Sequence, residues 1–309
     1  MLTLRHWSLL IALGAATACV QRTTDDAAGA PATPQKVGEI AGLKTPESAR
    51  YDAARDVWFI SNINGVPSDK DGNGFITRAS GDRATVDTMF IAGGKNGAVL
   101  NAPKGLAISG DTLWVADIDA VRAFNAQTGA PIKTIELRPK GAVFLNDITV
   151  AADGSLYITD TGIRIEASGM THPGPDRVFR VAGTEVTEVV RFAKQEGPNG
   201  IAFDRTSGHF VIVPFGAASI FHWSPGAAKA DSVASGVGGY DGVEILADGR
   251  VLVSSWTDSA VHVMSGSTLT PLIRGVPGPA DIGVDPGRNV VAIPIFEGNR
   301  VELWTIPAR

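Results

Sequence analysis

The 309-residue chain repeats one short phrase six times, at intervals of 39 to 57 residues. In each copy, a residue that is often proline is followed by a small or polar residue and then by alternating apolar positions. The six copies are residues 46–52, 103–109, 145–151, 198–204, 240–246 and 279–285. Alternation with a period of two places apolar side chains on one face of a strand, so each phrase predicts the start of a strand.

The segments that follow each phrase predict three further strands. A turn with Asp or Gly comes first, as at residues 152–154, and then a more continuously apolar segment, as at 156–158. A third segment follows a loop, and fourth segments are clear at 134–136 and 185–189. Four strands at this spacing are typical of propeller blades. A solenoid, the rival architecture, needs atypical polar caps at both ends, and none is evident.

We therefore predict an all-β fold: a six-bladed β-propeller with four antiparallel strands per blade, formed by residues 37–309. The repeat runs unbroken to Trp304, which indicates one domain. The sixth blade runs out of chain after three strands. Residues 37–43 are expected to supply its outer strand, which closes the ring and covers an exposed edge.

The first residues indicate export. Residues 1–18 combine a short basic head with an apolar run too short to span a bilayer, and Ala-Thr-Ala then precedes Cys19. This resembles a bacterial lipoprotein signal, in which the cysteine is lipidated; the alternative is ordinary cleavage that leaves a free thiol. Residues 19–36 are expected to form a disordered tether. The protein is thus predicted to be a membrane-tethered lipoprotein, periplasmic or associated with the outer membrane.

Composition limits the other possibilities. Cys19 is the only cysteine, so no intrachain disulfide can form. The net charge of −5 and the lack of a basic cluster argue against nucleic acid as a partner.

The second residue of each phrase is the most informative position for function. In a propeller the phrase would open the innermost strand, so these side chains would converge on the central channel. They are Glu47, Lys104, Asn146, Asn199, Asp241 and Ala280. Two carboxylates and two amides form a hard-oxygen set suited to Ca²⁺, whereas Zn²⁺ would prefer His or Cys. The alternative is that the Asn-Gly and Asp-Gly pairs only mark turns where strands begin.

Four of these phrases carry a resemblance to a known family. Pro46-Glu47, Asn146-Asp147, Pro198-Asn199-Gly200 and Asp241-Gly242 occur in this order and register. Across residues 47–304 the chain resembles the regucalcin/gluconolactonase family and its six-bladed relatives, the paraoxonases and squid-type diisopropylfluorophosphatases. The resemblance implies that Glu47, Asn146, Asn199 and Asp241 hold a divalent cation, usually treated as calcium. It also implies that Asp241 acts as base or nucleophile on a small lactone or ester.

Two residues depart from the family pattern. Lys104 would stand beside the cation, and at roughly 6 Å with an effective dielectric near 20 the repulsion is about 3 kcal/mol. Lys104 could instead neutralise a metal-free ring, or act catalytically by steadying an oxyanion with a lowered pKa. Ser48 stands where paraoxonases carry an acid that helps to bind a second, structural calcium.

Two loops supply further candidates. Asp69, Asp71 and Asn73 match the first, third and fifth positions of an EF-hand loop, but the twelfth position is Ser80, so the loop is either a weak second calcium site or a Gly-rich hairpin turn. His172 lies on a long rim loop, where it could serve as acid or base or simply be solvated.

Three aromatic residues are expected at the rim of the channel. Phe215, Trp256 and Phe296 each end a second strand. They would line an apolar pocket mouth or pack between blades.

The leading interpretation is a Ca²⁺-dependent hydrolase of lactones or related esters, with metal and substrate at the central channel. The alternative is a non-enzymatic extracytoplasmic propeller lipoprotein that serves as a binding or scaffold module. Lys104 paired with Glu47 or Asp241 would favour the alternative. Converging oxygens without such a partner would favour the enzyme.

Overall fold

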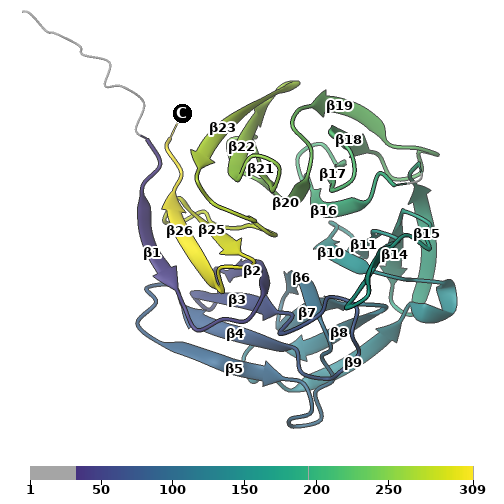
Figure 1. Cartoon of the computed structure of the whole chain (residues 1–309), viewed down its shortest axis with the longest axis vertical. Helices are drawn as coiled ribbons and strands as arrows, with labels where there is room; N and C mark the ends of the chain where they lie inside the picture. The colour runs from purple at the N-terminus through teal and green to yellow at the C-terminus, as the bar shows by residue number, and fades with distance from the viewer. Residues whose placement is uncertain (1–32, 194, 309) are drawn as a thin grey trace, which may run out of the picture.

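The protein is a ring of six four-stranded antiparallel sheets around a central channel (Figure 1). The computed structural model describes residues 33–193 and 195–308. In this part of the chain the regular structure is β apart from one turn of 3₁₀ helix, η1 (Arg138–Lys140). The predicted six-bladed propeller is confirmed.

Each blade places the strand that begins with a phrase innermost. From the channel outward, the first three blades are β2 (Pro46–Asp52), β3 (Val57–Asn62), β4 (Phe75–Ser80) and β5 (Val86–Ala92); β6 (Pro103–Ser109), β7 (Thr112–Asp117), β8 (Ala120–Asn125) and β9 (Pro131–Glu136); and β10 (Leu145–Val150), β11 (Leu156–Asp160), β14 (Arg177–Ala182) and β15 (Glu185–Arg191).

The other three blades follow the same order. They are β16 (Pro198–Phe203), β17 (Phe210–Pro214), β18 (Ser219–Trp223) and β19 (Asp231–Ser235); β20 (Tyr240–Ile245), β21 (Val251–Ser255), β22 (Ala260–Ser265) and β23 (Thr268–Arg274); and β24 (Gly283–Asp285), β25 (Val290–Ile295), β26 (Arg300–Thr305) and β1 (Lys36–Ile40).

The ring closes through the first strand of the chain. β1 pairs antiparallel with β26, with Ile40 opposite Val301 and Gly38 opposite Leu303, and the two strands lie side by side in Figure 1. Gln35 also exchanges hydrogen bonds with Thr305. The sequence prediction of closure by an N-terminal strand is confirmed, and the pairing covers the edge of β26.

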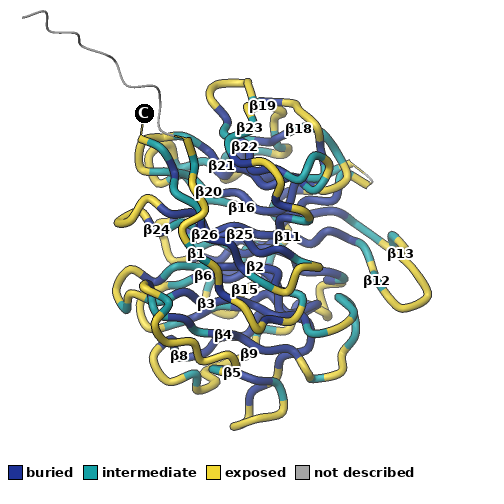
Figure 2. The backbone as a smooth tube through the Cα atoms, turned by 60° about the vertical axis from the view of Figure 1, so that its left-hand side comes forward, coloured by how far each residue is buried: buried dark blue, intermediate teal, exposed yellow. Residues whose placement is uncertain are grey.

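The core lies between neighbouring blades. Phe59 of the first blade packs with Leu106 and Phe124 of the second, and all three are fully buried. Between the third and fourth blades, the rings of Tyr157 and Phe210 lie 4.2 Å apart. Burial falls toward the outer strands, so the inner strands are dark and the periphery is yellow in Figure 2.

The sixth blade departs from the predicted pattern at its inner edge. Residues 279–285 were expected to form a strand, but β24 comprises Gly283–Asp285 alone. Asp281 instead bonds to the first blade: its N–H donates to the carbonyl of Glu47, and its carbonyl accepts from the N–H of Ala49. This parallel bridge joins the sixth blade to the first beside the channel.

The long loop of the third blade contains a hairpin that the sequence did not predict. Its strands are β12 (Arg164–Glu166) and β13 (Gly169–Thr171), and it protrudes from one face in Figure 2. Ile165 exchanges two hydrogen bonds with Ser68, which belongs to the long loop of the first blade. The two longest rim loops are therefore joined to each other.

The predicted export signal, tether and lipidated Cys19 fall wholly or mainly on residues outside the described part, and they stay predictions. Residues 33–193 and 195–308 contain no helix that is long and apolar enough to cross a bilayer.

Candidate functional site

β-Bulges aim the second residue of each phrase at the channel. In the first five blades the inner strand loses register at this residue, for example between Pro46 and Ser48 and between Tyr240 and Val243. A bulge leaves one residue unpaired and re-aims its side chain. In three blades, a buried hydroxyl on the second strand accepts a hydrogen bond from a freed backbone N–H. Ser61 accepts from Ser48, Thr159 from Asp147 and Ser254 from Gly242.

The glycines after these residues have a packing role. A Cβ on Gly200 would lie 2.4 Å from the carbonyl oxygen of Asp241, and a Cβ on Gly242 would lie 2.4 Å from the backbone nitrogen of Ile282. Both contacts are with the inner strand or segment of the next blade. The Asn-Gly and Asp-Gly pairs therefore do more than mark turns: the glycine lets adjacent blades approach, while the preceding side chain faces the channel.

The five polar residues of the ring meet at one cavity of about 330 Å³. Glu47, Lys104, Asn146, Asn199 and Asp241 all line it, and each is at least 95% buried. The structure thus brings together every residue that the sequence predicted for the central site. The sixth ring position, Ala280, is buried and contributes no polar group.

The two carboxylates of the ring each keep an unpartnered oxygen. Asp241 Oδ2 accepts a hydrogen bond of 2.8 Å from Trp256 Nε1, but Asp241 Oδ1 and Glu47 Oε2 are buried without a hydrogen-bond partner among the described residues. Burial raises the pKa of Asp241 to about 8, and the charge of Asp281 adds to this, while Trp256 and Asn199 oppose it. Burial also raises the pKa of Glu47 well above its usual range, with further contributions from Asp241 and Asp281.

Lys104 is held by backbone carbonyls instead of by these carboxylates. Its Nζ donates to the carbonyls of Pro67 and Ala102, each at 3.0 Å, and lies 4.2 Å from the ring centre of Phe144. Burial lowers its pKa to about 8, against the opposing charges of Glu47 and Asp117. No ion pair in residues 33–193 and 195–308 joins Lys104 to Glu47 or Asp241. Lys104 is therefore not paired with Glu47 or Asp241, the arrangement that would favour a non-enzymatic ring.

The two asparagines complete the oxygen set. Asn146 Nδ2 donates to Thr161 Oγ1 at 3.0 Å, and Thr161 Oγ1 in turn donates to the carbonyl of Pro198. This bond fixes the amide of Asn146 and leaves its Oδ1 for another partner. Asn199 lines the cavity beside Asp241.

This donor set fits a hard divalent cation. The orphaned oxygens of Glu47 and Asp241 and the amides of Asn146 and Asn199 are ligands of the kind that Ca²⁺ prefers. The described residues contain no group of three or more His, Cys, Asp or Glu side chains that could hold a metal. A cation here would therefore depend on the two asparagines as well as on the carboxylates.

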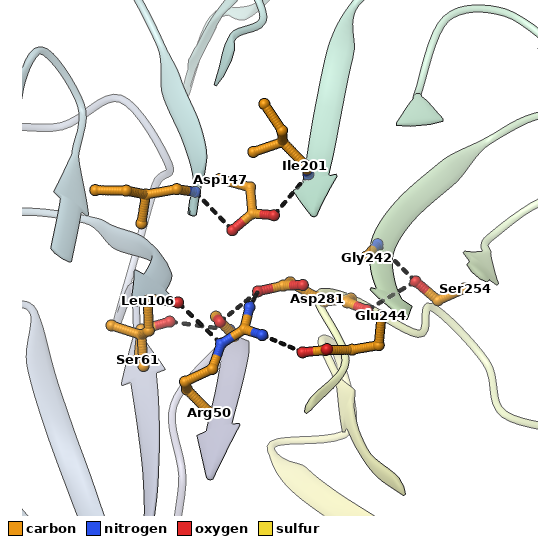
Figure 3. A network of polar contacts seen from close by, with 12 residues as sticks. Arg50, Ser61, Leu106, Asp147, Ile201, Gly242, Glu244, Ser254 and Asp281 are labelled. Carbon is orange, nitrogen blue, oxygen red and sulfur yellow. Dashed lines mark hydrogen bonds and ion pairs between the residues drawn. The ribbon is translucent and has the colours of Figure 1, made fainter. Parts of the chain in front are cut away.

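A second cluster of buried charge was missed by the sequence analysis (Figure 3). Arg50 on β2 contacts Glu244 on β20 and also Asp281, whose Oδ2 lies 3.5 Å from Arg50 Nη2. Arg50 Nε donates to the carbonyl of Leu106, and Ser48 Oγ donates to Asp281 Oδ2 at 2.5 Å. We call Arg50, Glu244 and Asp281 the arginine brace, because they tie the first, second, fifth and sixth blades together.

The guanidinium of Arg50 is the single cation of the brace, and it lies against two carboxylates. Burial opposes the charge on Arg50, but Glu244, Asp281 and Asp147 raise the pKa of its guanidinium above the usual value. Asp147 accepts hydrogen bonds from the backbone N–H groups of Ile148 and Ile201. Arg50 and Glu244 both occupy the fifth position of their phrases, and this shared register was the signal in the sequence that could have revealed them.

The aromatic rim residues line the cavity as predicted. Phe215, Trp256 and Phe296 form a continuous series, with ring centres 5.8 Å apart between Phe215 and Trp256 and 5.3 Å apart between Trp256 and Phe296. His172, in contrast, is absent from the residues that line the cavity. Its Nε2 lies 2.5 Å from Asp176 Oδ1.

The loop that resembles an EF-hand is a connection between β3 and β4. Asn73 Nδ2 donates to Asp71 Oδ2 at 2.5 Å, and the backbone N–H of Asn73 bonds to Asp71 Oδ1. Neighbouring Lys70 pairs with Asp119. Asp71 and Asn73 thus bond to each other, and calcium binding by Asp69, Asp71 and Asn73 stays a prediction.

Solved structures share this fold. A gluconolactonase from Xanthomonas campestris superposes with a TM-score of 0.63 at 20% identity, covering 86% of this chain and 87% of that one. A putative gluconolactonase gives 0.63 at 18% identity, with 89% and 92% covered. Luciferin-regenerating enzyme gives 0.66 at 11% identity, with 89% and 94% covered.

These neighbours confirm, at the level of the fold, the resemblance that the sequence motifs indicated. No protein-family model matches the sequence, and no curated protein does. One fold hosts many functions, so the residues of the site, and not the fold, indicate what this protein does.

Proposed function

We propose that the protein is a hydrolase of lactones or related esters that works with a hard divalent cation, Ca²⁺, at the central cavity. The observation that carries the proposal is the pair of buried, unpartnered oxygens Glu47 Oε2 and Asp241 Oδ1. Leaving carboxylates buried without partners is costly, so their convergence is best explained by a ligand that they bind. The gluconolactonases among the structural neighbours support the same class of reaction.

Each ring residue has a definite part in this proposal. Glu47, Asn146, Asn199 and Asp241 would hold the cation, which when bound supplies Lewis-acid polarisation of the substrate carbonyl. Asp241 is the base or nucleophile. Because Oδ2 accepts from Trp256, Oδ1 would use one lone pair for the cation and the other to take a proton from water or to attack the carbonyl carbon.

Lys104 stabilises the negative charge that develops on the substrate. Two of the three N–H bonds of the ammonium go to the carbonyls of Pro67 and Ala102, so one donor remains at the wall of the cavity. A fixed donor at the developing oxyanion lowers the barrier because it needs no reorganisation during the reaction. With its pKa lowered to about 8, Lys104 still carries the proton in most molecules at neutral pH.

We also infer, from residues 1–19, that the protein is exported and anchored to the membrane through a lipid on Cys19. Metabolic labelling with a radioactive fatty acid tests this. Label in the wild-type protein that is lost in Cys19→Ser supports the anchor, and an unlabelled wild-type protein contradicts it.

Calorimetric titration of the full-length protein with calcium tests the central site. We expect micromolar or tighter binding, weakened at least about tenfold in Asp241→Asn, because affinity follows the charge count of the ligands. Asp87→Asn, at an exposed position on β5, is the matched control and should leave binding unchanged. Millimolar binding that is equal in all three proteins would place calcium elsewhere and overturn the proposal.

Activity is measured on the same proteins with lactones and aryl esters. General acid–base groups contribute about 10²–10⁴-fold to rates, so Asp241→Asn should lose kcat by that order while Asp87→Asn retains it. Tight calcium binding without hydrolysis of any lactone or ester would favour the binding or scaffold role instead.

A further inference from the structure

The cavity divides into a polar floor and an apolar wall. The floor consists of the ring residues and Thr161. The remaining lining is apolar throughout: Ile63, Pro67, Phe144, Ile163, Ile165, Phe215, Trp256 and Phe296. These residues come from loops of five different blades, so the wall surrounds the space above the ring.

The polar atoms of the wall, and the hydroxyl of Thr161 in the floor, are already engaged. Trp256 Nε1 donates to Asp241 Oδ2, and Thr161 Oγ1 donates to the carbonyl of Pro198 while it accepts from Asn146. Ile165 and Ser68 satisfy each other through two hydrogen bonds. Above the ring, a bound molecule would meet hydrocarbon and aromatic surface with few groups free to bond to hydroxyls.

We propose that the substrate is a small lactone or ester whose body is an alkyl or aryl group, and that polyhydroxylated sugar lactones are poor substrates. This inference rests on the proposed function, since it places the ester carbonyl at the ring. It distinguishes the protein from the activity after which its gluconolactonase neighbours are named, although they share its fold.

The physical reason is the cost of moving each kind of substrate into this space. A hydroxyl that leaves water and finds no partner weakens binding, whereas an alkyl group that leaves water strengthens it. One buried methylene corresponds to about fourfold in affinity. The volume of about 330 Å³ is at the lower end of the range for ligand pockets, so the gain should stop after a few carbons.

A series of six-membered lactones tests the inference at a constant reacting group. The full-length protein, in calcium-containing buffer, is assayed with δ-valerolactone, δ-hexalactone, δ-octalactone and glucono-δ-lactone. Each kcat/KM is divided by the uncatalysed hydrolysis rate in the same buffer. We expect this normalised kcat/KM to rise about fourfold for each of the first added carbons. It should be at least about tenfold lower for glucono-δ-lactone than for δ-octalactone.

Variants of the wall locate the preference. Ile165→Asn and Phe215→Asn each place a polar group on the wall without touching the ring. We expect each to reduce the advantage of δ-octalactone over δ-valerolactone by about threefold or more. Ile132→Asn, at an exposed position on the outer strand β9, is the control and should leave the ratio unchanged.

The outcomes separate the inference from the proposed function. Hydrolysis of glucono-δ-lactone that equals or exceeds that of δ-octalactone would overturn the inference and leave the hydrolase standing. If no lactone is hydrolysed, the proposed function fails. Calorimetry with the non-hydrolysable lactams piperidin-2-one and 6-propylpiperidin-2-one then decides the inference: tighter binding of the propyl compound supports an apolar ligand, and equal or absent binding of both overturns it.

Discussion

The central channel contains two clusters of buried charge that are built in opposite ways. In the arginine brace, the guanidinium of Arg50 contacts Glu244 and Asp281, and Ser48 adds a further hydrogen bond. In the ring, Lys104 bonds to backbone carbonyls instead of to the carboxylates. Glu47 and Asp241 each keep a buried oxygen without a partner among the described residues, as Asp281 does at Oδ1 in the brace. The ring is also the more deeply buried cluster: its five polar residues are at least 95% buried, whereas the side chains of Arg50 and Glu244 are 20% and 17% exposed.

The difference lies in what the cation of each cluster contacts. The guanidinium of Arg50 contacts two carboxylates and joins blades, whereas the ammonium of Lys104 bonds to backbone carbonyls and leaves the ring carboxylates without an ion pair among the described residues. We therefore expect the ring, and not the brace, to gain stability when a cation binds. This comparison predicts opposite responses to mutation in the two clusters.

The largest effect is expected for the brace. Arg50→Met leaves Glu244 and Asp281 buried without their cation, and breaking a buried pair in this way costs about 3–5 kcal/mol. Denaturant unfolding of the calcium-free protein measures the loss. Arg274→Met, at the exposed end of β23, is the control. A loss below about 1 kcal/mol would mean that water solvates Glu244 and Asp281, or that protons neutralise them, once the arginine is removed. That result would contradict the distinction between the two clusters.

Removing the positive charge of Lys104 should strengthen the binding of calcium. In Lys104→Met the charge repulsion of about 3 kcal/mol estimated at roughly 6 Å disappears, so calcium should bind ten- to a hundredfold more tightly. Calorimetry measures the affinity, with the exposed Lys95→Met as control. Tighter binding together with a lower kcat would support the catalytic role of Lys104. Unchanged affinity would show that the amine is neutral or screened in the native ring.

Asp241→Asn should stabilise the protein when calcium is removed. The substitution deletes a carboxylate with a buried, unpartnered oxygen, and burying such a group costs about 1–3 kcal/mol. Denaturant unfolding in the presence of a chelator should therefore show a gain for Asp241→Asn, whereas Arg50→Met shows a loss. A loss in both variants would contradict the comparison.

The pH dependence of stability spreads its effect over several pH units. The raised pKa of Asp241, about 8, means that the folded chain holds a proton that the unfolded chain releases near pH 4. Stability of the calcium-free protein should therefore decline between about pH 4 and 8, by up to about 1.4 kcal/mol per pH unit for this proton. The raised pKa values of Glu47, Asp147 and Asp281 act in the same direction.

Lys104 has the opposite effect at higher pH. Its pKa is lowered to about 8, so stability should recover as pH rises above that value toward the ordinary lysine range. Unfolding curves collected from pH 4 to 10 with and without calcium measure both limbs. Calcium should flatten the first limb, because it favours the ionised carboxylates; a decline that calcium leaves unchanged would place the titrating groups outside the ring.

Much of the site could be predicted because the blades repeat. Glu47, Asn146, Asn199 and Asp241 share one position of one phrase, and a closed ring must bring equivalent positions together. The same regularity predicted closure by β1, since three strands remained for the sixth blade. Phe215, Trp256 and Phe296 could be placed at the cavity because each follows a second strand.

The features that escaped prediction all depend on contacts between segments far apart in the chain. Arg50 and Glu244 are separated by 194 positions, and each alone looks like an ordinary charged residue at the end of a strand. Ile165 reaches the cavity because its loop forms a hairpin that bonds to Ser68, 97 positions away. Neither pairing leaves a local pattern.

The sequence by itself determined the number of blades, the closing strand and the ring of polar residues at the channel, because a repeated phrase transmits its register to every copy. The tertiary structure alone decided which charges are in contact, because that depends on distances across the channel. It also decided that Lys104 bonds to Pro67 and Ala102 instead of to the carboxylates, and that the wall above the ring is apolar. The role proposed for Lys104 in the reaction rests on the first of these outcomes, and the proposed kind of substrate rests on the second.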